Sequence, residues 1–96
     1  MRFEWDDRKA AGNRLKHRVS FEEAAAAFDD PDALYEDDSR HSATERRRRV
    51  LARFGRRILS VIFTLREDRI RLISVRSASR RERALYASAK HTENRF

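Results

Sequence analysis

Three consecutive runs rich in Val, Ile, Leu and Phe constrain the fold of this chain more than any other feature of its sequence. The runs span Arg47–Phe54, Arg57–Leu65 and Arg69–Ser77, and short polar turns separate them at Gly55-Arg56 and Arg66-Glu67-Asp68. Turns this short can join only neighbouring antiparallel strands, because a parallel crossover needs roughly a dozen residues. The second half of the chain is therefore predicted to form an antiparallel meander.

Alternation within the runs indicates which side chains share a face of the meander. In the middle run one face would carry Leu59, Val61, Phe63 and Leu65, and the other Ile58 and Ile62, so both faces are at least partly covered. With the second turn at Arg66–Arg69, the strand pairs become Leu65 with Ile70, Phe63 with Leu72, and Val61 with Ser74. This register predicts that the apolar face ends in Arg76.

Two capping boxes indicate where helices begin. In Ser20-Phe21-Glu22-Glu23 and in Ser79-Arg80-Arg81-Glu82, the Ser caps a helix and the Glu reaches back to the Ser N–H. The first helix would continue through Ala27 and stop at Asp29-Asp30-Pro31, because a residue before Pro disfavours helical geometry. The second would run to about Lys90.

The remaining elements complete an α+β plan. A short strand is expected at Phe3-Glu4-Trp5, followed by a helix that Asp6 or Asp7 caps and that ends near Arg18. A further short strand is expected at Ala33–Glu36, and residues 91–96 are expected to fray. Two N-terminal helices would then pack on a three- to four-stranded antiparallel sheet with a C-terminal helix. The 96 residues suit a single domain, 1–96.

The charge of the chain is unevenly distributed. Residues 1–45 hold 12 acidic and 7 basic residues, a net −5, whereas residues 46–96 hold 4 acidic and 16 basic residues, a net +12. Of those 16 basic residues 15 are Arg, whose planar fork of donors matches phosphate oxygens. A basic half of this kind favours binding to nucleic acid, and a solvated surface or a dock for an acidic protein is the alternative.

The residue types present exclude several kinds of chemistry. The chain has no Cys, which rules out disulfides, thiolate zinc sites and cysteine nucleophiles. It also has no Gly-rich phosphate loop and no Gly-x-Ser-x-Gly elbow. The three His residues show no ligand spacing, and adjacent carboxylates point apart, so neither a metal nor a cofactor is expected. With no signal peptide and no apolar run of membrane-spanning length, a cytoplasmic protein is expected.

An Arg at a strand end beside a helix N-terminus outlines an anion site. The helix after Arg76 would offer its free N–H groups, and Arg80, Arg81 and Arg83 would add positive charge around a phosphate. Lys16 and His17 suit proton transfer that needs no metal. The alternatives stay open: these Arg side chains are solvated or pair with Glu82 and the acidic first half, and His17 only caps its helix.

In combination, these residues resemble the BrnT family of toxin–antitoxin toxins. The N-terminal match comprises Phe3-Glu4-Trp5-Asp6, Lys9, Asn13, Lys16-His17, Val19-Ser20-Phe21-Glu22-Glu23-Ala24 and Phe28-Asp29-Asp30-Pro31. The C-terminal match comprises Arg57, Val61-Ile62-Phe63-Thr64, Arg66, Arg71, Ile73-Ser74-Val75-Arg76, Ala78, Arg80-Arg81-Glu82-Arg83 and Tyr86. The chain departs from the family pattern at Arg18, where Gly is usual, and at Arg46-Arg47-Arg48-Arg49, where more apolar residues are usual.

The resemblance implies a RelE-like fold and a ribonuclease that inhibits translation. It also implies neutralisation by a BrnA-type ribbon-helix-helix antitoxin, with operator DNA bound only through the antitoxin. The expected catalytic residues are Lys16, His17, Arg76, Arg80 and Glu82. The expected RNA-binding residues are Arg57, Arg66, Arg71, Arg81, Arg83 and Tyr86, the last as an exposed aromatic that stacks on a base.

The leading hypothesis is therefore a metal-independent endoribonuclease whose Arg residues stabilise the charge that develops on a phosphate. One rival is a non-catalytic nucleic-acid-binding or operon-regulating module that uses the same basic face. Another is a protein-interaction domain that docks an acidic partner. RNA cleavage that resists EDTA distinguishes the first hypothesis from both rivals.

Overall fold

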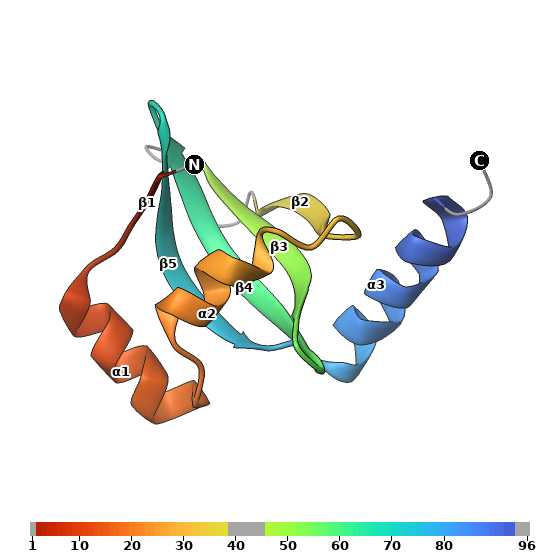
Figure 1. Cartoon of the computed structure of the whole chain (residues 1–96), viewed down its shortest axis with the longest axis horizontal. Coiled ribbons are helices and arrows are strands. Elements are labelled where there is room, and N and C mark those ends of the chain that lie inside the picture. Colours follow the sequence, from red (N-terminus) through yellow and green to blue (C-terminus); the bar gives the residue numbers. More distant parts are fainter. Residues whose placement is uncertain (1, 39–45, 94–96) are drawn as a thin grey trace.

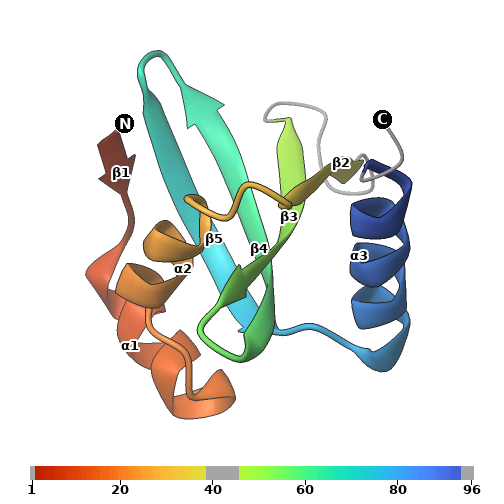
Figure 2. The same cartoon turned by 45° about the vertical axis from the view of Figure 1, so that its right-hand side comes forward.

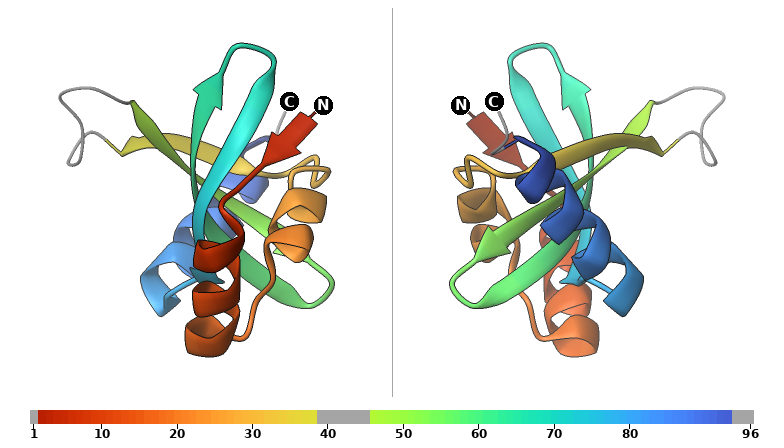
Figure 3. Two further views of the ribbon diagram at one scale, coloured as in Figure 1. Left: turned by 90° about the vertical axis from the view of Figure 1, so that its left-hand side faces the viewer. Right: turned by 90° about the vertical axis from the view of Figure 1, so that its right-hand side faces the viewer.

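The computed structural model describes residues 2–38 and 46–93, and it arranges them in three layers (Figure 1). The elements are β1 (Arg2–Glu4), α1 (Asp7–His17), α2 (Phe21–Ala27), β2 (Leu34–Asp38), β3 (Arg47–Phe54), β4 (Arg57–Arg66), β5 (Arg69–Ser77) and α3 (Arg80–Glu93). The helices α1 and α2 cover one face of a twisted sheet, and α3 lies on the other (Figure 3). None of these helices is long and apolar enough to cross a membrane.

The sheet has five strands in the order β1-β5-β4-β3-β2. The predicted meander of β3, β4 and β5 is confirmed, and β2 adds to it antiparallel to β3. The prediction of a three- to four-stranded antiparallel sheet is wrong, because β1 pairs in parallel with β5 and makes the sheet mixed. This pairing joins residues that are far apart in the chain, so no local pattern in the sequence signals it.

Both predicted capping boxes form. The N–H of Glu23 donates to Ser20 Oγ, and the N–H of Ser20 donates to the Glu23 carboxylate, each at 3.0 Å. Ser79 and Glu82 exchange the same two bonds at 2.8 and 3.1 Å. The helix that the second box starts continues to Glu93, three residues beyond its predicted end at Lys90. Residues 94–96, the rest of the segment predicted to fray, lie outside the described residues.

The hydrophobic core lies between the sheet and the two N-terminal helices. We call this side of the sheet the apolar face; its buried residues are Val50, Ala52, Leu59, Val61, Phe63, Ile70, Leu72 and Val75. Phe21, Ala24 and Ala27 of α2 pack against it. The ring of Phe28 meets those of Phe3 and Phe63 at centroid distances of 5.2 and 5.1 Å, which ties β1 to the centre of the sheet.

An irregularity in β5 changes which face its last residues occupy. Ile73 has no partner in β4, and the pairs beyond it are Ile62 with Ser74, Val61 with Val75 and Ser60 with Arg76. Side chains alternate with a period of two, so one extra residue reverses the faces of everything that follows. The prediction that Arg76 ends the apolar face is therefore wrong. Val75 occupies that face, and Arg76 lies on the opposite one.

The side chain of Asn13 fastens α1 to the open edge of β5. Its Nδ2 donates to the carbonyl oxygen of Val75 at 2.7 Å, and its Oδ1 accepts from the N–H of Val75 at 3.1 Å. The pairing of β1 with β5 reaches only Arg71, so no strand lies beside Val75 on this edge of β5. The amide makes the two bonds that a neighbouring strand would make, and α1 is thereby held along this edge.

Replacing Asn13 by Ala should lower the free energy of unfolding by about 1–3 kcal/mol, because the backbone N–H and C=O of Val75 then lose their partners while part-buried. Urea unfolding followed by circular dichroism measures this difference. Arg8→Ala, an exposed position on the same helix, is the matched control. Equal loss of stability in the two variants would contradict a special role for the Asn13 amide.

Candidate functional site

The strand register places several arginines on the side of the sheet opposite the apolar face. Four of them are Arg47 and Arg49 of β3 and Arg71 and Arg76 of β5, and we call the surface that these four frame the arginine face. Ile62 and Ser74 face each other within this frame and remain partly exposed. The helix α3 packs chiefly over β3 (Figure 2), so the part of the face on β4 and β5 is only partly covered.

Glu82, in the first turn of α3, organises one end of the arginine face. Both of its oxygens accept hydrogen bonds from Arg76, from Nη1 at 2.7 Å and from Nη2 at 3.0 Å. Nη1 of Arg49 lies 3.4 Å from the second oxygen. Because the Ser79 N–H also donates to Glu82, the capping box fixes the carboxylate that orients the arginines.

This network keeps Glu82 ionised. Burial raises the pKa of Glu82, but the hydrogen bonds from Arg76 and Ser79 and the charges of Arg76 and Arg49 outweigh it, lowering the pKa from 4.5 to about 2. A carboxylate this acidic holds no proton to donate near neutral pH and accepts one poorly. The alternative in which Arg76 pairs with Glu82 is thus observed, and Glu82 is suited to positioning Arg76.

Glu4 plays the same part at the other end of the arginine face. It accepts hydrogen bonds from Arg71 at 2.8 Å and from Arg69 at 3.2 Å, and Arg66 lies at 4.0 Å. The hydrogen bond from Arg71 lowers the pKa of Glu4 most; burial opposes it, and the hydrogen bond from Arg69 adds to it. Nε of Arg69 also lies 3.8 Å from Asp68 Oδ1, so Arg66 and Arg71 belong to a corner where arginines and carboxylates form a network of ion pairs.

Lys16 and His17 lie at the C-terminal end of α1, on the other side of the sheet from Arg76. Lys16 is exposed, His17 is partly buried, and among the described residues no hydrogen bond or ion pair joins either to Arg76. The end of α1, the end of β5 and the start of α3 nevertheless lie at the same end of the molecule in every view (Figures 1, 2 and 3). The predicted proton-transfer residues therefore lie at the same end of the molecule as Arg76 but do not contact it.

The other predicted arginines have different surroundings. Arg57 donates from Nη2 to Ser77 Oγ at 2.6 Å and from Nη1 to the carbonyl oxygen of Arg18 at 3.1 Å, so it links the end of α1 to the end of β5. The remaining three, Arg80, Arg81 and Arg83, project from the first turn of α3 and are exposed. These three arginines are therefore available to a ligand at the start of α3.

Tyr86 is not the exposed stacking platform that the sequence suggested. Only 3% of the residue is exposed, and its hydroxyl donates to Asp30 Oδ2 at 2.6 Å. Burial and this hydrogen bond raise the pKa of Tyr86. The guanidinium of Arg53 lies 5.9 Å from the ring centroid. Tyr86 therefore anchors α3 to the end of α2 and to β3, a role that its sequence neighbours did not signal.

The sequence singled out the Arg46–Arg49 run, whose extra arginines would extend the RNA-binding surface or mark a diverged partner surface, but it did not name Arg47 and Arg49 as site residues. Both lie in the Arg46–Arg49 run, where alternate residues of a strand share a face and Arg48 points to the opposite side. That period of two was visible in the sequence. It could not indicate that the shared face is the one that carries Arg76, because the bulge at Ile73 decides this.

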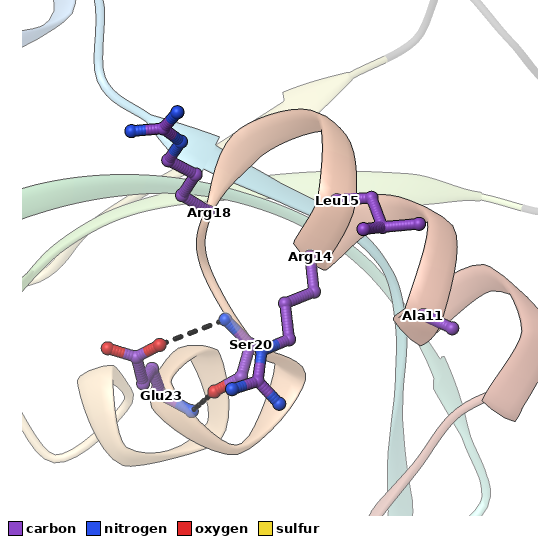
Figure 4. Close-up of a pocket in the computed structure, with 6 residues that line it drawn as sticks. All are labelled: Ala11, Arg14, Leu15, Arg18, Ser20 and Glu23. Carbon is purple, nitrogen blue, oxygen red and sulfur yellow. Dashed lines mark hydrogen bonds between the residues drawn. The ribbon is translucent and has the colours of Figure 1, made fainter.

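An open depression of about 720 Å³ lies between α1 and α2, away from these arginines (Figure 4). Its Ser20 and Glu23 already bond to each other in the capping box, and Leu15 at its edge is 86% exposed. The depression thus offers two arginines and an apolar side chain rather than an acid–base pair. Within residues 2–38 and 46–93, no three His, Asp or Glu residues gather as a metal-binding group.

A comparison with known protein families identifies the family to which the chain is similar. The model of the family described as "Ribonuclease toxin, BrnT, of type II toxin-antitoxin system" matches residues 5–82. No curated protein matches the chain. The matched region extends from the residue after β1 to Glu82, so it includes most of the arginine face and ends before Tyr86.

The pKa of Glu82 leads to a prediction for acid stability. Its folded-state pKa, about 2, lies below the ordinary 4.5, so the carboxylate stabilises the fold above pH 4.5 and this contribution is lost as the pH falls toward 2. Glu82→Gln should lower the free energy of unfolding on the order of 1–2 kcal/mol at pH 6, after allowance for solvent screening. Urea unfolding at pH 6 and pH 3 should show that the difference in the free energy of unfolding between the wild-type protein and Glu82→Gln is smaller at pH 3. Glu22→Gln, at an exposed position on α2, is the control; a pH-independent gap for Glu82→Gln would contradict the network.

Proposed function

Because the chain belongs to the BrnT family of ribonuclease toxins of type II toxin–antitoxin systems, we propose that it is an endoribonuclease that needs no metal ion and inhibits translation by cleaving RNA. The observation that carries this proposal is the doubly hydrogen-bonded pair of Arg76 and Glu82. It holds a guanidinium in one orientation at the partly open end of the arginine face, with 38% of the Arg76 side chain exposed. Preorganised donors of this kind stabilise charge that develops on phosphate oxygens.

Arg76 keeps donors for a substrate. Its bonds to Glu82 and to the Ser77 carbonyl use both N–H groups of Nη1 and one of Nη2. Of the five N–H groups of an arginine, the Nε–H and the second Nη2–H remain without an acceptor among the described residues. These two are free to bind the non-bridging oxygens of a phosphate.

The proposed reaction is an attack of the ribose 2′-oxygen on the adjacent phosphorus. The 2′-hydroxyl proton passes to a base, the bond from phosphorus to the 5′-oxygen breaks, and that oxygen takes up a proton. A 2′,3′-cyclic phosphate and a 5′-hydroxyl result. Arg76 would hold the negative charge on the non-bridging oxygens while Glu82 keeps it in position.

Lys16 and His17 are the proposed proton-transfer residues. The bonds from Asn13 to Val75 hold α1 along the open edge of β5, and His17 lies one helical turn beyond Asn13. Arg76 follows Val75 directly. An RNA strand that bends around this edge could therefore meet Arg76 on one side and the end of α1 on the other.

Other arginines would bind the RNA backbone. Arg71 and Arg76 lie on one face of β5, opposite Thr64 and Ser60 of β4, and so about 13 Å apart along the strand, enough for more than one phosphate of an extended chain. Arg66 stands near Arg71, and the exposed group of Arg80, Arg81 and Arg83 stands beside Arg76. Arg57 is better suited to positioning, because it bonds to Ser77 and to the Arg18 carbonyl.

A toxin of this class implies an antitoxin partner. We propose that the partner is a BrnA-type ribbon-helix-helix protein, that operator DNA is bound only through it, and that the pair acts in the cytoplasm. The second candidate function is RNA binding without cleavage. It is favoured by one observation: no described acid–base residue contacts Arg76 except Glu82, whose carboxylate is held ionised.

Replacing Arg76 by Lys tests the proposal. Lys keeps the charge but loses the planar fork, so RNA cleavage in the presence of EDTA should slow by roughly 10²–10³ while RNA affinity changes little. Cleavage of a fluorescent RNA and anisotropy titration measure the two effects. Arg56→Lys, in the exposed turn between β3 and β4, is the control.

Three outcomes would contradict the proposal. Wild-type cleavage by Arg76→Lys would mean that the reaction centre lies elsewhere. Loss of wild-type cleavage in EDTA would make the enzyme metal-dependent. Salt-sensitive RNA binding by a wild-type protein that cleaves no RNA would favour the non-catalytic function.

A further inference from the structure

Three polar side-chain atoms are buried without a hydrogen-bond partner in the described part of the chain, and all three belong to one face of the sheet. They are Nε of Arg47, Nε of Arg49 and Oγ of Ser60. Arg47 and Arg49 are two residues apart on β3, and Ser60 is the β4 residue opposite Arg76. An unpaired buried donor costs free energy, so a group of three on one face points to a missing partner.

The two arginines are held loosely in other respects as well. Arg49 reaches Glu82 and Glu36 only through Nη1, at 3.4 and 3.7 Å, which are ion-pair rather than hydrogen-bond distances for a guanidinium. Among the side chains that the structure describes, which leave out that of Asp38 opposite Arg47 on β2, no hydrogen bond or ion pair engages the guanidinium of Arg47. Both side chains would therefore gain donor–acceptor bonds by turning toward an anion on this face.

Arg48, between them, behaves differently. It lies opposite Phe63 on the apolar side of the sheet, where its Nε is 3.7 Å from Asp37 Oδ1. Unlike its neighbours, Arg48 has no unpaired buried nitrogen. The run of arginines on β3 thus splits into two on the arginine face and one on the other face, and only the two share a surface with Arg76.

We infer that Arg47 and Arg49 form a second phosphate-binding site, which holds the RNA strand at a phosphate other than the one at Arg76. The strands β3 and β5 are separated by two strand spacings, about 10 Å. Arg47 and Arg49 lie opposite Thr64 and Ile62 of β4 and Arg76 lies opposite Ser60, so the two sites are also offset along the strands by about 7 to 13 Å. Ile62 and Ser74, small or apolar and partly exposed, form the floor between them. An RNA strand would then cross the sheet from β5 toward β3.

This inference rests on the proposed function in that the anion is taken to be RNA. A phosphate fits the site because each guanidinium offers a fork of donors and a phosphate offers several oxygens to the pair. The site would add affinity without entering the reaction, because its distance from Arg76 separates it from the scissile phosphate. Loss of Arg47 should therefore raise KM and leave kcat nearly unchanged.

The test is binding of a 12-nucleotide, fluorescein-labelled single-stranded RNA with every 2′-hydroxyl methylated, so that no cleavage occurs. Arg47→Gln should weaken binding roughly tenfold, the effect expected for one charge-assisted contact. It should also reduce the steepness of the plot of log affinity against log salt by about 1. Arg49→Gln should weaken binding similarly, although it also removes the contact with Glu82.

Arg48→Gln is the matched control, since it removes the same charge from the same strand on the opposite face. Equal weakening by Arg47→Gln and Arg48→Gln would mean that net charge alone matters and would overturn the inference. So would wild-type affinity of Arg47→Gln with its fold intact by circular dichroism.

A 12-residue poly-glutamate peptide, titrated in parallel, separates RNA from an acidic protein segment. If Arg47→Gln weakens peptide binding and spares RNA binding, the site belongs to a protein partner and the inference fails. If the wild-type protein binds no RNA at low salt, the proposed function fails as a whole. Failure of the second site alone looks different, because the wild-type protein then still binds RNA and only the Arg47 effect is missing.

Discussion

The unpaired residue Ile73 in β5 decides which charges of this protein share a surface. Arg71 and Arg76 are five residues apart, so in a regular strand they would point to opposite faces. The extra residue brings both to the face that α3 partly covers, and it turns Val75 into the core. A strand without this bulge would bury one guanidinium against α1 and α2, at a cost of several kcal/mol for an unpaired charge.

Two carboxylates on this face determine which of its arginines are held in one orientation. Glu82 and Glu4 stand at opposite ends of the arginine face, and each accepts two hydrogen bonds or more from arginine side chains. Each orients its arginines by hydrogen bonds without cancelling the charge of the face, because the arginines outnumber the acids. A surface of this kind combines fixed donors, such as Arg76, with less constrained ones, such as Arg47. The first kind suits chemistry on a phosphate, and the second suits the binding of a flexible chain.

The N-terminal helix stabilises the fold through side-chain hydrogen bonds to the backbone of β5 more than through buried residues of its own. No residue of α1 is buried, yet Asn13 supplies the two hydrogen bonds that the Val75 backbone would otherwise lack. Arg18 follows the last residue of the helix and caps its end; its φ of 56° is left-handed, and its carbonyl oxygen accepts a hydrogen bond from Arg57. Most residues other than Gly adopt this conformation at some cost, and the bond from Arg57 helps to hold Arg18 in it. The end of α1 is thereby fixed beside the end of β5.

The sequence by itself determined the parts of this protein that depend on neighbours in the chain. Both capping boxes, the three strands of the meander and the hairpin register as far as Phe63 and Leu72 follow from local spacing, because caps, tight turns and period-two alternation act over a few residues. The uneven distribution of charge and the family resemblance can likewise be recognised in the sequence without knowledge of the fold. Only the tertiary structure decided the parallel pairing of β1, the bulge at Ile73 and the burial of Tyr86 against Asp30. Each of these joins segments that are distant in sequence and is set by how the layers pack. For that reason the sequence named Arg76 and Glu82 as site residues but put Arg76 on the wrong face, and it did not reveal that Arg47 and Arg49 share their surface.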